Sequence, residues 1–177
     1  MKITFFANAS PSIGGGHVMR CLTLANSLVQ HGAHVAFVVT EETLECVPAL
    51  GRRGFELFDP EELASQSTDI LVFDSYAIDA NLEHAFRPHV RRIVVIDDLA
   101  NRQHDCDLLI DQNLGREERH YMGLLPPLAR VLAGPRYAML RPEFAAARSH
   151  ALERRQANFA DGLPVTTDPR VNGPDRC

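Results

Sequence analysis

The sequence predicts an α/β fold, a Rossmann-like parallel sheet with helices on both faces. Three observations indicate it. Short apolar runs alternate along the chain with stretches of helical periodicity, three of the runs end in acidic residues, and a glycine-rich loop joins the first run to the first helix. Because parallel strands end at the same edge of a sheet, we expect the loop and the acidic residues to lie together there.

The first part of the chain alternates strand and helix. Lys2–Ala7 is the first expected strand, and apolar residues at helical spacing predict a helix over His17–Gln30, with Gly32 as its stop signal. The β-branched run His34–Val39 is the second expected strand. A short helix over Thr43–Leu50 and a further apolar run follow.

Three buried strands are expected next, over Ile70–Phe73, Arg92–Ile96 and Leu108–Ile110. They are followed by the acidic residues Asp74, Asp97 with Asp98, and Asp111. The remaining helices are expected over Asp79–Val90, capped by Asp79, and over Pro142–Arg155, with Pro142 near its start.

We expect residues 1–157 to form one Rossmann-like domain. The stretch 158–177 has several glycines and prolines and little periodicity, which is typical of a disordered tail.

Composition excludes several classes of function. The net charge of −5 argues against a general affinity for nucleic acid. The four cysteines form no CxxC pair and no histidine cluster has metal-ligand spacing, so we expect reduced thiols, no metal and no cofactor. The start of the chain lacks a signal-peptide pattern and no apolar run has the length of a membrane span, which predicts a cytoplasmic protein without a membrane span.

The loop between the first strand and helix contains Gly14, Gly15 and Gly16. Glycines let the backbone approach a ligand closely, and the helix behind them offers free N–H groups and a partial positive charge, which suits an anion or oxyanion. The loop does not match the dinucleotide-binding fingerprint, because Met19 occupies the position of its third glycine. It does not match a P-loop either, because it contains no lysine.

His17 is the candidate general base. The positive helix terminus and Arg20, one turn on, both favour a neutral imidazole, and a nearby carboxylate such as Asp97 or Asp98 could oppose this or orient the ring. The alternatives are structural: His17 as a capping or solvent-facing residue, Arg20 on a solvated face, and single acids as caps of turns.

Ile13–Ala25 resembles the opening motif of the UDP-2,4-diacetamido-2,4,6-trideoxy-β-L-altropyranose hydrolases of pseudaminic acid biosynthesis. Four later segments agree in order, so the resemblance covers roughly residues 1–155; they are Asp74–Tyr76, Ile96–Ala100, Cys106–Asn113 and Gly134–Phe144. The family is similar to GT-B glycosyltransferases, which have two Rossmann-like domains facing a cleft, and this chain would be the N-terminal half.

The resemblance implies metal-independent hydrolysis of the bond between the anomeric carbon and the diphosphate, which releases UDP and free sugar. His17 matches the family's catalytic histidine. Gly14, Gly15, Gly16 and Arg20 would contact the substrate, and Asp74, Tyr76 and Asp98 would line the sugar side of the cleft.

The family pattern breaks near Asn158, where a UDP-binding C-terminal domain is expected to follow. We therefore expect a truncated or out-of-frame chain whose missing domain could be encoded separately. Two other functions stay open: a glycosyltransferase domain of the same fold, and an inactive remnant or binding module.

Overall fold

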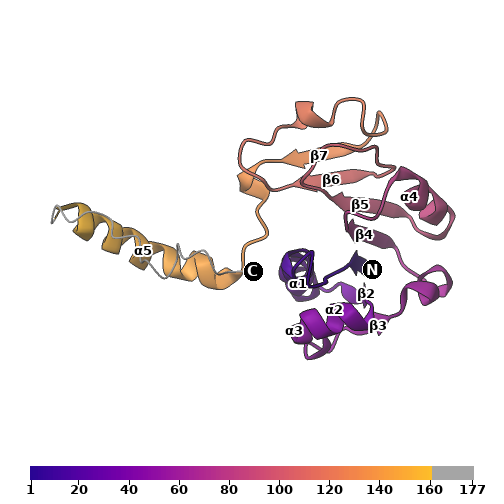
Figure 1. Ribbon diagram of the computed structural model, residues 1–177, viewed down its shortest axis with the longest axis horizontal. Helices are drawn as coiled ribbons and strands as arrows, with labels where there is room; N and C mark the ends of the chain where they lie inside the picture. The colour runs from indigo at the N-terminus through magenta and orange to yellow at the C-terminus, as the bar shows by residue number, and fades with distance from the viewer. Residues whose placement is uncertain (161–177) are drawn as a thin grey trace. The chain divides into compact units, whose positions relative to one another are not determined.

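The computed structural model describes residues 1–160, with side chains described through residue 155. It forms two compact units, Met1–Met139 and a second that starts at Leu140. The first unit is built on a seven-stranded sheet of order β3-β2-β1-β4-β5-β6-β7 (Figure 1). Its strands are β1 (Lys2–Ala7), β2 (His34–Val38), β3 (Glu56–Phe58), β4 (Ile70–Asp74), β5 (Arg92–Ile96), β6 (Leu108–Asp111) and β7 (Arg130–Ala133).

All neighbouring strands pair in parallel, as predicted. From β1 the chain passes outward through β2 to β3, and then crosses back to continue with β4 on the other side of β1. The strand order therefore reverses between β1 and β4, where Ala7 pairs with Asp74. In open α/β sheets, ligands bind beyond the carboxyl ends of the strands at such a reversal.

One face of the sheet is covered by α1 (Gly16–Gln30), α2 (Glu41–Cys46) and α3 (Pro48–Gly51). Val18, Cys21, Leu22 and Ala25 of α1 recur at helical spacing and are buried against alternate residues of the central strands. Phe5 of β1 belongs to this core and is fully buried. This packing fixes the position of α1 against β1 and its neighbouring strands.

The opposite face is covered by α4 (Ala80–Phe86) and by the 3₁₀ turns η1 (Pro60–Ser65) and η3 (Glu118–Tyr121). Leu63, Phe86 and Tyr121 pack there against Phe73 and its neighbours from the other strands. Helical segments therefore flank both faces, and the predicted fold class is confirmed.

The observed elements differ from the expected ones in three places. The helix expected over Thr43–Leu50 is two helices, because Pro48 disfavours helical backbone at Val47, whose ψ of 72° breaks the run. The helix expected over Asp79–Val90 ends at Phe86 and continues as the 3₁₀ turn η2 (Arg87–His89). Strand β7 was not predicted, because none of its four residues is fully buried at the edge of the sheet.

The described part of the second unit is mainly α5 (Pro142–Ala160), which agrees with the expected final helix and continues beyond it. Most of the expected tail, 158–177, lies outside the described residues, and the domain boundary at 157 stays a prediction. Within residues 1–160, no helix has both the length and the apolar character needed to cross a membrane.

Candidate functional site

The carboxyl edge of the sheet gathers the predicted site residues. Asp74 ends β4, Asp97 and Asp98 follow β5, and Asp111 ends β6, while the glycine loop follows β1. Their placement on one edge agrees with the expectation for a parallel sheet.

The start of α1 lies between β1 and β4. Gly15 is its N-cap and Gly16 its first residue, and no side chain caps the helix. Gly14 has a φ of 78°, a left-handed conformation that favours glycine, and its N–H binds the carbonyl of Ser10 at 2.7 Å. A Cβ on Gly15 would lie 2.9 Å from Val47, whereas Gly16 has open space in front of it.

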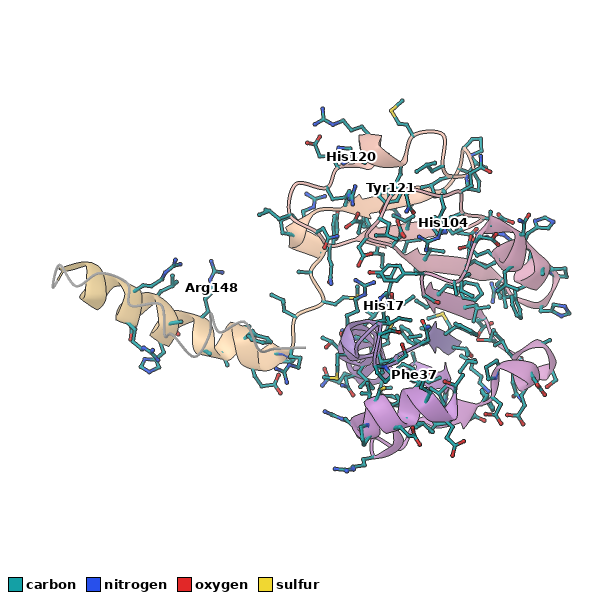
Figure 2. All side chains as sticks on the ribbon, viewed as in Figure 1. His17, Phe37, His104, His120, Tyr121 and Arg148 are labelled. Carbon is teal, nitrogen blue, oxygen red and sulfur yellow. The ribbon has the colours of Figure 1, made fainter. Side chains whose placement is uncertain are left out.

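His17, Arg20 and Cys21 follow the spacing i, i+3, i+4, so they share one face of α1 (Figure 2 labels His17). All three donate to Asp74, whose side chain is completely buried. His17 Nδ1 lies 2.5 Å from Oδ1, Arg20 binds both carboxylate oxygens at 2.6 Å through Nε and its terminal nitrogen, and the Cys21 thiol lies 3.3 Å from Oδ2. Asp74 is therefore the centre of the site.

The charge state of Asp74 follows from these contacts. Burial by itself would raise its pKa, but the hydrogen bonds from Arg20 and His17 outweigh burial and hold the pKa below its usual value. Burial would likewise lower the pKa of Arg20, but Asp74 and Asp98 raise it, so the guanidinium stays charged. Burial and Asp74 raise the pKa of the Cys21 thiol, which keeps it protonated as a donor.

An ionised Asp74 fixes the tautomer of His17. Because a carboxylate can only accept, Nδ1 must carry the proton, so the neutral ring has its free lone pair on Nε2. Nε2 of His17 has no hydrogen-bond partner among the described residues. It is not one of the fully buried polar atoms that lack a partner, so it is accessible to solvent. The ring thus presents a proton acceptor on the side away from Asp74.

His17 is more enclosed than the sequence suggested, since only 6% of the residue is exposed. Tyr76 packs edge-on against its ring, with centroids 4.6 Å apart, and remains 44% exposed itself. The Tyr76 hydroxyl donates to Asp98 Oδ2 at 3.3 Å, and burial together with Asp98 raises the pKa of Tyr76. Tyr76 therefore lies between His17 and Asp98 at the surface of the site.

Asp98 also binds Arg20, at 3.1 Å, and its Oδ1 is buried without a hydrogen-bond partner in the part of the chain that the structure describes. Asp97, which we considered as a possible carboxylate for His17, instead points into the protein. It accepts hydrogen bonds from the N–H groups of Leu99 and Ala100 and from Arg102, and its side chain is fully buried. The two adjacent side chains point in different directions because Asp97 accepts hydrogen bonds from the backbone of the turn, whereas Asp98 faces the site.

Arg20 contacts carboxylates with Nε and both terminal nitrogens, and its side chain is 11% exposed. Its observed role is thus to hold Asp74 and Asp98 together, and the predicted contact with substrate stays a prediction.

Cys21 was missed as a site residue, although its position four residues after His17 could have indicated it. Within residues 1–160, no cluster of His, Cys, Asp or Glu could hold a metal ion.

Comparisons with known proteins agree with the recognised motifs. No family model matches the chain. A Campylobacter jejuni UDP-2,4-diacetamido-2,4,6-trideoxy-beta-L-altropyranose hydrolase is 27% identical over 172 residues, which cover 90% of this chain and 58% of that protein. An uncharacterized protein of Methanocaldococcus jannaschii is 22% identical over 166 residues, which cover 87% of this chain and 34% of that protein.

Among solved structures, MurG of Acinetobacter baumannii is similar with a TM-score of 0.48 and 11% identity, over 75% of this chain and 45% of MurG. The chain spans little more than half of the hydrolase and about a third of the archaeal protein. By sequence, then, this chain is similar along nine-tenths of its length to a UDP-2,4-diacetamido-2,4,6-trideoxy-beta-L-altropyranose hydrolase.

Proposed function

We propose that this chain supplies the water-activating half of an enzyme that processes nucleotide sugars, and that the reaction is hydrolysis of UDP-2,4-diacetamido-2,4,6-trideoxy-β-L-altropyranose. The observation that carries the proposal is the pair of His17 and Asp74 at the strand-order reversal, with the contact of 2.5 Å between Nδ1 and Oδ1. The similarity to the Campylobacter hydrolase supports the substrate.

In the proposed reaction, His17 Nε2 takes a proton from water while the water oxygen attacks the anomeric carbon. The bond between that carbon and the diphosphate oxygen breaks, and UDP leaves with the electron pair. With His17 neutral, the charges of Asp74, Asp98 and Arg20 sum to −1, so the proton that reaches the imidazole makes the cluster neutral. Asp74 thus stabilises the imidazolium as it forms.

The positions of the glycine loop, Tyr76 and Asp98 around His17 suggest their roles in binding the substrate. The N–H groups at the start of α1, next to Gly14, Gly15 and Gly16, favour a negatively charged group of the substrate. Tyr76 and the Asp98 carboxylate face the sugar side. Binding of UDP itself is proposed to need a second domain.

The direct test is release of UDP and free sugar, followed by ³¹P and ¹H NMR. The chain should be assayed alone and joined to the part of the Campylobacter relative that it does not cover. We expect hydrolysis by the joined protein, with UDP bound weakly by the chain alone in calorimetry. UDP release only when an acceptor alcohol is added would indicate a glycosyltransferase instead, and a lack of any turnover by the joined protein would favour a binding module.

Substituting Gly16 with Ala separates a role in binding from a role in folding. Gly16 has open space in front of its Cα and no positive φ, so the substitution should leave the free energy of unfolding unchanged or raise it by about 0.5 kcal/mol. If the diphosphate or sugar approaches this backbone, however, the added methyl should weaken substrate binding, seen as a raised KM.

The matched control is Gly15→Ala, whose Cβ meets Val47 at 2.9 Å and should destabilise the fold by about 1–3 kcal/mol. Chemical denaturation and steady-state kinetics measure both effects. An unchanged KM in the Gly16→Ala protein would show that the substrate does not approach the loop.

A further inference from the structure

A strained turn presents Asp98 to the site. The turn after β5 has Ala100 at a φ of 51°, and no other non-glycine residue in the described chain has a positive φ. The left-handed conformation costs an alanine about 1–2 kcal/mol and persists only where the surroundings determine it. The Asp97 carboxylate provides part of this restraint by accepting the N–H groups of Leu99 and Ala100 at 3.2 and 2.8 Å.

A buried chain of polar contacts holds Asp97 in turn. Tyr121 comes from η3 and is labelled in Figure 2. Its hydroxyl lies 3.0 Å from Asp97 Oδ2 and 2.8 Å from Asp111 Oδ2, and the residue is 2% exposed. A phenol has one proton and donates to one carboxylate at a time, so the charge on Asp111 needs another partner. Arg116 supplies it, with Nε 2.5 Å from the same Asp111 oxygen.

Arg116 also returns to the turn, because its terminal nitrogen donates to the main-chain carbonyl of Asp98 at 2.7 Å. The contacts thus form a closed ring that starts on the side chain of Asp97, passes through Tyr121, Asp111 and Arg116, and ends on the backbone of Asp98. Tyr121 at one end of the network binds the side chain of Asp97, and Arg116 at the other end binds the main-chain carbonyl of Asp98. We name these contacts the Asp97–Asp98 ring.

We propose that Tyr121 and Arg116 are positioning residues for the His17 site, acting through the Asp97–Asp98 ring. The link is the Asp98 carboxylate, which binds Arg20 while Arg20 binds Asp74. If the ring opens, Asp98 is no longer held in place and Arg20 loses its contact with that carboxylate. The hydrogen bonds between Arg20 and Asp74 should then open more often. The inference rests on the proposed function for its catalytic consequence, although the coupling itself does not require substrate.

The test uses exchange of the Arg20 Nε proton with solvent, measured by NMR, because that proton is held between Arg20 and Asp74. Tyr121→Phe removes the hydroxyl and keeps the ring packing, and Arg116→Gln breaks the same network from its less buried end. Each should speed the Arg20 exchange about tenfold, the effect of losing roughly one hydrogen bond from a local opening equilibrium. Tyr137→Phe is the matched control, since the Tyr137 hydroxyl contacts only exposed Arg136 among the described residues.

Arg87 is the internal reference, because its Nε binds Asp105 away from the ring. Equal acceleration at Arg20 and Arg87 would mean general loosening and would overturn the proposal, as would no change at Arg20. If Tyr121→Phe fails to fold, Arg116→Gln decides the question in the same way. If the variants speed Arg20 exchange but the joined wild-type protein does not hydrolyse the substrate, this inference stands and the proposed function is refuted. If the joined protein is active, both variants should lower kcat more than they raise KM.

Discussion

Replacing His17 with Gln should reduce hydrolysis by the joined protein about 10²- to 10⁴-fold, the usual contribution of a general base. Gln keeps an amide near Asp74 but has no group that can take a proton from water at neutral pH. The loss should appear in kcat, because water activation acts in the transition state rather than in substrate binding. UDP release under saturating substrate measures it.

The control is His31→Gln, at the opposite end of the same helix, where the imidazole is exposed and contacts only the Ser27 carbonyl in the described structure. It should retain full activity. If His17→Gln retained wild-type kcat, His17 would not be the base. An equal loss in both variants would point to damage to α1 rather than to loss of the base.

The Asp74→Asn substitution should lower both stability and activity. Asp74 is the buried acceptor for Arg20, so its neutralisation leaves a buried guanidinium with Asp98 as its remaining carboxylate partner. Breaking such a pair typically destabilises a protein by about 3–5 kcal/mol, and the contact with Asp98 places this case near the lower limit. The amide also no longer requires the proton to be on Nδ1, so hydrolysis should fall about as far as in His17→Gln.

The double variant of His17 and Asp74 tests whether the two act as a unit. If Asp74 works by orienting His17, the losses in kcat should be strongly non-additive, and the double variant should be no slower than His17→Gln alone. Additive losses would contradict the pairing. Asp79→Asn is the control, because Asn serves as well as Asp at the N-cap of α4.

Acid unfolding gives a second measure of Asp74. Its pKa in the folded protein lies below the unfolded value of 3.8, so its stabilisation is present above about pH 4 and is lost as pH falls through the lower folded pKa. The wild-type protein should therefore lose more free energy of unfolding than Asp74→Asn between about pH 4 and pH 2. Parallel curves for the two proteins would show that Asp74 is not ionised in the native state.

The sheet and its functional edge could be predicted because local patterns determine them. Buried parallel strands are short apolar runs, and helix α1 carries its buried residues at helical spacing. The acids after β4, β5 and β6 identified the edge without any knowledge of strand order, since every carboxyl end of a parallel sheet lies there. Strand β7 gave no such signal, and the break between α2 and α3 depends on the steric effect of one proline.

The partners within the site could not be predicted. The sequence determined that His17 lies in the first turn of a helix behind a glycine loop, and that Asp74, Asp97 and Asp98 lie at the carboxyl ends of strands. Only the tertiary structure decided that Asp74 faces His17 and that Asp97 turns inward, because strand order places β4 beside β1 and the turn after β5 needs a carboxylate for its own N–H groups. Contacts between residues 54 to 78 positions apart, such as those of Arg20 with Asp74 and Asp98, depend on how the strands are ordered, which no local pattern specifies.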